Sequence, residues 1–323
     1  MSQVLSNTPR TTIHVGLLKT ASTTLQAGFA ANPALTYVDY RLVEPLRNAA
    51  SAAAESGQAL PGQVPVGNLL SVLRASNKPV VISDERFSGI PNYNYQIKSG
   101  AVTRAFQTHC AQLLHAVCPQ ARVVIVLREP RAWLTSYYKQ FLKFGEHRRI
   151  KPYCRAHHDH LVQSYSVDFL TNLYADLFGA KNVTVLPFEM LRKDSPRFLE
   201  IFSDIVGTDV LLPESANKGI DDELIEHVRQ LNAVRRFLAR KAQWTDAYAR
   251  QTSLLFFDVV EGALTDQGAT QRILKRALPP TRLDVEPPTE ILEAMRQAVN
   301  RTVGENPLFA PFRDLYAGAA SKA

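Results

Sequence analysis

A lysine and several hydroxyl side chains follow the first predicted strand, residues 11–15, and lie where a helix is predicted to begin, near Ser22. The segment reads Gly16-Leu17-Leu18-Lys19-Thr20-Ala21-Ser22-Thr23-Thr24. A helix N-terminus offers backbone N–H groups and the positive end of the helix dipole, and Lys19 adds a full charge. This combination indicates a phosphate or sulfate site. A serine- or threonine-capped helix beside an unrelated lysine is the alternative.

This segment differs from the Gly-x-x-x-x-Gly-Lys-[Ser/Thr] loop that binds nucleoside triphosphates. No glycine directly precedes Lys19, and Gly16 lies only three residues upstream. No clear strand-end aspartate that could hold magnesium follows. A P-loop kinase acting on a small molecule is therefore a second hypothesis rather than the first.

An arginine and a serine form a second candidate phosphate site. Arg128 follows the apolar run 123–127, which predicts a central strand, and Ser136 lies eight residues later within a predicted helix, 131–143. A guanidinium group offers a planar fork of donors and a hydroxyl group offers one further bond. The two side chains can therefore converge on one phosphate group.

Together the two segments resemble the sulfotransferases that use 3′-phosphoadenosine 5′-phosphosulfate (PAPS). In that family a first strand leads into a Pro-Lys-x-Gly-Thr-Thr-type loop that holds the 5′-phosphosulfate, and a later strand leads into Arg-x7-Ser, which holds the 3′-phosphate. The residues that match are Lys19, Ser22, Thr23 and Thr24 in the first motif, and Arg128 and Ser136 in the second. Residues 185–191, Val-Leu-Pro-Phe-Glu-Met-Leu, also resemble the family's strand and Tyr-Glu-x-Leu-like turn.

The resemblance covers roughly residues 11–200 and implies a P-loop-like α/β fold with PAPS as co-substrate and no metal. It implies that the donor contacts Lys19, Thr20, Ala21, Ser22, Thr23, Thr24, Arg128 and Ser136. Two positions depart from the family pattern: Leu18 replaces the usual proline and Ala21 the usual glycine. Ala21 places a methyl group where close approach to the phosphate, or a positive φ, would favour glycine. A PAPS-binding protein without turnover therefore stays open, although the retained motif residues favour an enzyme.

Two adjacent carboxylates, Asp84 and Glu85, follow the predicted strand 80–82 and are candidate general bases. Transfer to a hydroxyl group needs a base that takes the acceptor's proton and a cation that stabilises the developing charge. Family members use histidine or glutamate, and the carbohydrate-modifying members resemble the glutamate type. The resemblance therefore implies Glu85 as the base and Lys19 as the cation. Asp84 or a histidine as base, and simple pairing with Arg86, are the alternatives.

Three of the eight histidines lie within residues 157–160, near Cys154, but their spacing fits no tight zinc pattern. We interpret this region as a flexible substrate-binding loop. His14, inside the first predicted strand, is interpreted as a core residue with satisfied hydrogen bonds. Lys218 and Gly219 resemble a loop that closes over the nucleotide, with an ordinary helix start as the alternative.

Predicted strands and helices alternate over the first 190 residues, and only helices follow. The strands are predicted at 11–15, 35–40, 80–82, 123–127 and 183–186, and the later helices at 195–206, 221–240, 268–277 and 287–302. This alternation predicts a parallel sheet covered by helices on both faces. We expect one domain over residues 1–323, with a flexible tail at 1–10 and a helical C-terminal extension over 207–323.

The composition fits a globular protein, since 46% of the 323 residues are hydrophobic and 21% are charged. The longest strand-like apolar run has five residues, whereas a membrane helix needs about 20. The N-terminus shows no secretory pattern. Cys110, Cys118 and Cys154 are interpreted as free thiols, so we expect a cytoplasmic protein.

The positive charge is concentrated in one segment. Residues 128–155 hold eight basic and two acidic side chains, which gives +6 of the net +7. Such a concentration indicates one anionic ligand or an acidic substrate rather than nucleic acid, and a solvated basic surface is the alternative. We therefore expect a sulfotransferase acting on a hydroxyl group of a carbohydrate or glycolipid, with the basic loop 143–155 selecting the acceptor. A non-catalytic binder of PAPS or of a sulfated glycan is the third hypothesis.

Overall fold

A computed structural model describes residues 10–62, 64, 66–89, 98–213, 222–241 and 283–318. The chain divides into two compact units. The first comprises Met1–Trp133, Asp159–Ala216 and Glu290–Ala323, and the second comprises Leu134–His158 and Asn217–Thr289. The predicted helix 268–277 and the predicted closing residues Lys218 and Gly219 lie outside the described residues. The expectation of a single domain stays a prediction.

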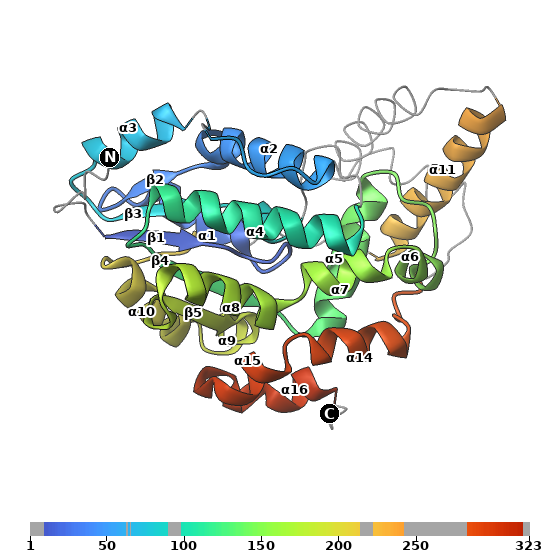
Figure 1. The fold of residues 1–323 in the computed structure, drawn as a ribbon. Helices are drawn as coiled ribbons and strands as arrows, with labels where there is room; N and C mark the ends of the chain where they lie inside the picture. The colour runs from blue at the N-terminus through green and yellow to red at the C-terminus, as the bar shows by residue number, and fades with distance from the viewer. Residues whose placement is uncertain are drawn as a thin grey trace. The chain divides into compact units, whose positions relative to one another are not determined.

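A parallel sheet forms the centre of the first unit, with strand order β2-β3-β1-β4-β5 (Figure 1). The strands are β1 (Thr11–His14), β2 (Thr36–Val38), β3 (Val80–Ser83), β4 (Arg122–Leu127) and β5 (Val183–Pro187). Every described pairing is parallel, which confirms the predicted sheet. The carboxyl ends of parallel strands share one edge, so the residues that follow β1, β3 and β4 meet there.

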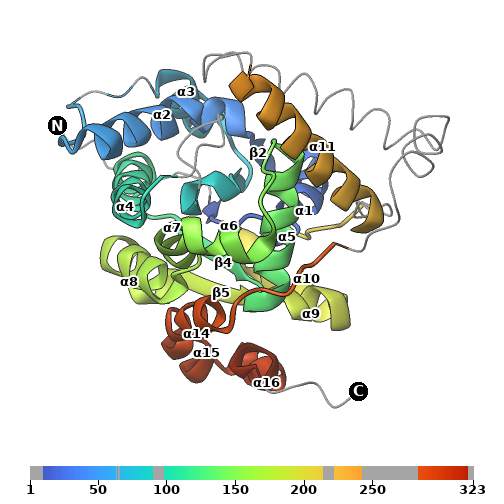
Figure 2. The ribbon, with the colours of Figure 1, turned by 90° about the vertical axis from the view of Figure 1, so that its right-hand side faces the viewer.

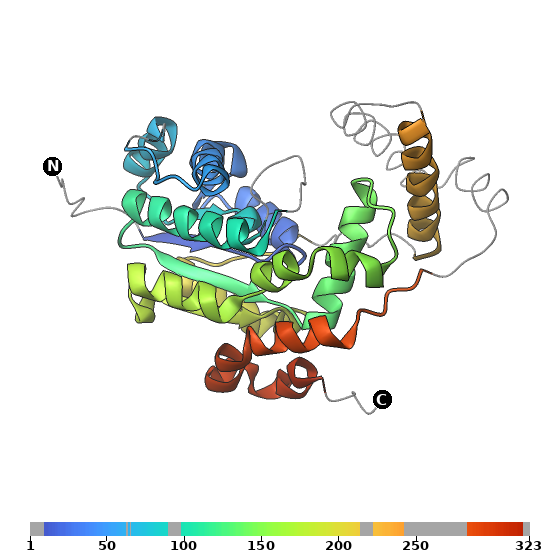
Figure 3. The same ribbon diagram turned by 45° about the vertical axis from the view of Figure 1, so that its right-hand side comes forward.

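Helices cover both faces of this sheet, as predicted. Helices α2 (Tyr40–Ser56), α4 (Gly100–Val117) and α8 (Val167–Phe178) lie on one face, and α1 (Ser22–Ala31) and α10 (Ser195–Val206) lie on the other (Figure 2). Residues 123–127 of β4 are completely buried, as expected for a central strand with both faces covered. Helices α9 (Phe188–Lys193), α15 (Asn300–Glu305) and α16 (Arg313–Ala317) lie on the side of the sheet that ends with the edge strand β5 (Figure 3).

Three predictions of local structure are wrong. The basic loop expected at residues 143–155 contains most of α6 (Ile150–Ala156), and the flexible loop expected at residues 157–160 contains the start of α7 (His158–Ser164). Ile150, Tyr153 and Cys154 are buried at helical spacing, and this apolar stripe accounts for the helix despite the basic residues around it. The helix expected at 287–302 is two helices, α14 (Thr289–Gln297) and α15. Helix α3 (Gly67–Ala75) was not anticipated from the sequence.

The second unit contains most of α5 (Pro130–Lys143), together with α6 and α11 (Asp222–Lys241). Asn232 on α11 donates to Leu142 O at 2.7 Å and to Glu146 O at 2.9 Å. Burial opposes ionisation of Glu146, but hydrogen bonds from His157 and from backbone N–H groups prevail and lower its pKa to about 2. The two bonds of Asn232 hold the turn between α5 and α6 against α11. None of the helices that the structure describes has the length and apolar character of a membrane span.

Candidate functional site

The loop between β1 and α1 has three successive carbonyl groups engaged by side chains. Thr20 Oγ1 donates to Leu17 O at 2.5 Å. Trp133 Nε1 donates to Leu18 O at 2.8 Å, and Arg128 Nη1 donates to Lys19 O at 3.0 Å. With these acceptors occupied, the loop offers N–H groups rather than carbonyl oxygens to a ligand. An anion requires such donors.

The N-terminus of α1 is also open to an anion. Its N-cap residue, Ala21, has no side chain that can accept a hydrogen bond, and the first turn contains no acidic residue. In contrast, Asp39 caps α2, Ser99 caps α4 and Asp194 caps α10. The first-turn N–H groups of α1 therefore receive no side-chain cap, although Thr24 N donates to Ala21 O at 3.0 Å. No first-turn carboxylate offsets the helix dipole.

Two residues of this loop lie in the left-handed region: Lys19 has φ 69° and Ala21 has φ 63°. The family's glycine at the position of Ala21 fits this conformation, because glycine adopts it without steric cost. Ala21 therefore adopts a conformation that favours glycine. Strained backbone of this kind is typical of ligand-binding loops.

Ala21→Gly is expected to stabilise the protein by about 1 kcal/mol, because it removes a left-handed alanine. Gly57→Ala is the matched reverse change, since Gly57 has φ 67° and a Cβ there would meet nothing within 4 Å. It should destabilise by a similar amount. Equilibrium unfolding in urea measures both. A loss of stability in Ala21→Gly would show that the methyl group contributes packing that outweighs the strain.

Ser22 Oγ is buried and has no hydrogen-bond partner. The absence of a side chain at Gly16 leaves space beside this hydroxyl group, because a Cβ on Gly16 would lie 2.7 Å from Ser22 Oγ. A buried hydroxyl group without a partner is costly unless a ligand supplies the bond. These residues therefore fit an oxyanion such as a phosphate or sulfate group.

His14 is buried beside the same glycine. Its Nδ1 lies 2.8 Å from Ser83 Oγ, but its Nε2 is buried without a partner. The expectation of a fully satisfied core histidine is therefore wrong for Nε2. Burial lowers the pKa of His14 to about 4, so the ring is neutral at pH 7.

Arg128 joins the two predicted phosphate motifs. Besides its bond to Lys19 O, its guanidinium group lies 4.9 Å from the ring centre of Phe188. Burial lowers the pKa of Arg128, and the negative charge of Glu189 partly offsets this shift. Ser136 lies on the part of α5 that belongs to the second unit, and its pairing with Arg128 stays a prediction.

The end of β4 is held by three side chains. Tyr165 Oη donates to Arg128 O at 2.5 Å. Tyr316 Oη lies 3.0 Å from Leu127 O and 2.6 Å from Glu189 Oε2. Glu189 Oε1 accepts a bond from the backbone N–H of Glu129. The Phe-Glu pair after β5 thus supports the strand end that presents Arg128.

Glu85 lies at the start of the 3-10 turn η1 (Glu85–Ser88), just after β3. Gln26 Nε2 donates to its carboxylate at 2.9 Å. Ser88 Oγ lies 2.8 Å from Glu85 O and 2.8 Å from Gly16 O, which ties η1 to the β1–α1 loop. Burial raises the pKa of Glu85, and the charge of Asp84 raises it further. Such a carboxylate holds a proton more readily than an exposed one, as suits a general base.

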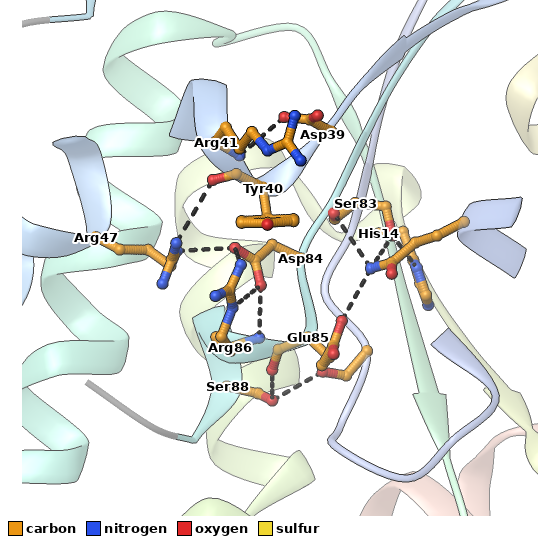
Figure 4. A network of polar contacts seen from close by, with 12 residues as sticks. His14, Asp39, Tyr40, Arg41, Arg47, Ser83, Asp84, Glu85, Arg86 and Ser88 are labelled. Carbon is orange, nitrogen blue, oxygen red and sulfur yellow. Dashed lines mark hydrogen bonds and ion pairs between the residues drawn. The ribbon is translucent and has the colours of Figure 1, made fainter. Parts of the chain in front are cut away.

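Asp84 is engaged in the fold instead (Figure 4). Its buried carboxylate lies 2.7 Å from Arg47 Nε and 2.8 Å from Arg86 Nε, and it caps η1 through Arg86 N. Arg86 in turn stacks over Tyr40 at 4.7 Å. These ion pairs make Asp84 a structural residue, so Glu85 is the better candidate base of the two.

The histidines near residue 157 have protein partners. His157 Nε2 lies 2.8 Å from Arg148 Nη1, and His160 Nδ1 lies 2.9 Å from Thr103 Oγ1. Among the residues that the structure describes, no group of three or more histidine, cysteine or acidic side chains could hold a metal ion. The three cysteines are free and buried.

Gln26 and Trp133 were missed from the sequence. Gln26 lies one helical turn after Ser22, and this spacing could have placed it on the same side of α1 as the loop. Trp133 reaches Leu18 O across 115 positions of sequence, and no local signal predicts that bond.

The sequence matches the sulfotransferase domain family over residues 12–263. No curated protein matches it significantly. Among solved structures, a sulfotransferase from Alicyclobacillus acidocaldarius is similar, with 14% sequence identity and a TM-score of 0.43. That match covers 72% of this chain and 92% of the other.

Proposed function

Because the chain belongs to the sulfotransferase family, we propose that it transfers a sulfuryl group from PAPS to a hydroxyl group of a carbohydrate or glycolipid. The observation that carries the proposal is the bond from Arg128 Nη1 to Lys19 O, 3.0 Å long. It brings the motif proposed for the 3′-phosphate against the loop proposed for the 5′-phosphosulfate. The carbohydrate acceptor rests on the resemblance of Glu85 to the glutamate of the carbohydrate-modifying members.

The residues proposed to hold the donor lie on both motifs. In this proposal the phosphosulfate contacts Lys19, Thr20, Ala21, Ser22, Thr23 and Thr24, the 3′-phosphate contacts Arg128 and Ser136, and Lys218 and Gly219 close over the nucleotide. PAPS supplies an activated sulfuryl group on a phosphate leaving group. The open N-terminus of α1 and the buried, unpartnered Ser22 Oγ support this assignment. No metal has a part in it.

In this proposal Glu85 takes the proton from the acceptor hydroxyl, and Lys19 stabilises the charge that develops on the transferred group and on the phosphate. Glu85 follows β3, the neighbour of β1 in the sheet, and the bond between Ser88 Oγ and Gly16 O connects its turn to the loop. A carboxylate with a raised pKa accepts a proton more readily than an ordinary one.

Donor binding and turnover test the proposal separately. Desulfated PAPS should raise the melting temperature more than ATP does, since a ligand at 100 times its dissociation constant adds about 2.7 kcal/mol of stability. When the protein is incubated with PAPS and a panel of sugars and glycolipids, chromatography should detect the formation of desulfated PAPS. Stabilisation by ATP alone would favour the kinase hypothesis. Binding of PAPS without turnover on any acceptor would favour a non-catalytic binder. We also propose a cytoplasmic location, which the free cysteines support.

Arg128→Ala is expected to weaken binding of the 3′-phosphorylated nucleotide far more than binding of the analogue without that phosphate. Loss of a charge-assisted pair costs roughly 1.5–3 kcal/mol. Calorimetry with both nucleotides measures the difference. Arg155→Ala, on an exposed position of α6, controls for the loss of one positive charge. Equal losses for the two nucleotides would reject the assignment.

A further inference from the structure

Gln26 connects α1, the helix that follows the β1–α1 loop, to the candidate base. It lies on α1 four residues after Ser22, and its Nε2 donates to Glu85 Oε2 at 2.9 Å. The same Nε2 lies 3.4 Å from Ser83 O and 3.3 Å from Ser83 Oγ. One amide group therefore contacts both the end of β3 and the carboxylate that follows it.

This contact extends to β1. Ser83 Oγ lies 2.8 Å from His14 Nδ1, and a Cβ on Gly16 would lie 3.0 Å from His14 Nε2. A continuous set of polar contacts thus runs from Glu85 through Gln26 and Ser83 to His14. The Nε2 of His14 lies beside the glycine that opens the loop, without a hydrogen-bond partner. Because His14 is neutral, this connection adds no charge beside Glu85.

The surroundings of Glu85 make its amide partner important. Burial and the neighbouring Asp84 both disfavour the carboxylate, while the hydrogen bond from Gln26 and the charge of Arg86 favour it. Tyr37 on β2 is the further titratable group nearby, and its raised pKa, caused mainly by burial, keeps its hydroxyl group protonated. Of these groups, Gln26 is the one that contacts Glu85 from α1, the helix that follows the β1–α1 loop.

We propose that Gln26 is a positioning residue, which holds the Glu85 carboxylate in its ionised form and in a fixed orientation relative to the β1–α1 loop. The inference rests on the proposed role of Glu85 as the base. Since Gln26 and Ser22 lie one turn apart on the same helix, the hydrogen bond links the position of the base to the position of the bound donor. The role requires the amide N–H and not merely the size of the side chain.

Gln26→Met tests this, because methionine has a similar length and no N–H donor. We expect turnover with PAPS to fall about tenfold or more, as for loss of a hydrogen bond to a charged group, with unchanged affinity for desulfated PAPS. The acid limb of the pH–rate profile should move to higher pH, because the ionised carboxylate has lost its donor. Gln112→Met, at an exposed position on α4, is the matched control and should change neither quantity.

Two measurements separate positioning from a general effect on the fold. In a Glu85→Gln background, Gln26→Met should cause no further loss of single-turnover rate, whereas a general structural effect would be additive. Carbon-13 NMR of glutamate-labelled protein, with the Glu85 signal assigned from Glu85→Gln, should show its titration at higher pH in Gln26→Met. An unshifted titration, or an additive loss, would overturn the inference. If the wild-type protein transfers no sulfuryl group, the proposed function fails, and the NMR titration still decides whether Gln26 favours the carboxylate.

Discussion

Glu85→Gln is expected to reduce the single-turnover rate of sulfuryl transfer roughly 100-fold or more, the usual scale for loss of a general base. Affinity for desulfated PAPS should stay close to that of the wild type, because the amide keeps the size of the side chain and removes only its basicity. Rapid-quench kinetics and calorimetry on the same purified variant measure the two quantities. Near-normal single-turnover chemistry would remove Glu85 as the base.

Asp84→Asn is the matched control, and the structure predicts a different outcome for it. The change leaves the buried Arg47 and the partly exposed Arg86 without their carboxylate, and breaking a buried pair such as Asp84–Arg47 costs about 3–5 kcal/mol. We therefore expect a marked fall in melting temperature. Glu85→Gln should not show this fall, because burial and the charge of Asp84 already disfavour the ionised form of the wild-type side chain. Loss of stability in Glu85→Gln together with loss of donor binding would indicate a structural carboxylate.

The pH dependence of stability gives a further check on Glu85. Its pKa is raised in the folded protein, so the folded state holds this proton more tightly than the unfolded chain does. The stability contributed by the protonated group is present at low pH and is lost as the pH rises through the folded pKa. Relative to the wild type, Glu85→Gln should therefore gain stability as the pH rises through that range.

Lys19→Ala is expected to lower turnover by about 100-fold, the scale seen when one electrostatic stabiliser of a transition state is removed. Affinity for desulfated PAPS should change less, because the backbone N–H groups, the α1 N-terminus and Arg128 remain. The change is conservative for the backbone, since alanine and lysine have the same steric restriction at the left-handed φ of 69°. Steady-state kinetics with varied PAPS separates turnover from the Michaelis constant.

Lys181→Ala provides the control for Lys19, because Lys181 is exposed in the 3-10 turn η2 (Ala180–Asn182). It should leave both kinetic constants unchanged. An unaltered turnover number in Lys19→Ala, with only the Michaelis constant raised, would make Lys19 a residue that binds the donor without stabilising the transition state.

The sequence by itself predicted the order of the five strands and the family. The apolar run 123–127 and the alternation of strands and helices predicted the parallel sheet, because such patterns are set by neighbouring residues. The motifs around Lys19 and Arg128 lie at strand ends, where local sequence already fixes a turn into a helix. The parallel sheet then brings the ends of β1, β3 and β4 to one edge, as expected.

The tertiary structure alone decided which polar groups pair. Asp84 and Glu85 are adjacent carboxylates that only the family resemblance distinguished at the level of sequence, and the ion pair of Asp84 with Arg47 joins residues 37 positions apart in the chain. The bond from Gln26 to Glu85 spans 59 positions, and that from Trp133 to Leu18 spans 115. These pairings depend on packing across the sheet, whereas local patterns reflect only the backbone and the neighbouring side chains. The left-handed conformation of Ala21 is likewise imposed by its surroundings, because the intrinsic preference of alanine opposes it.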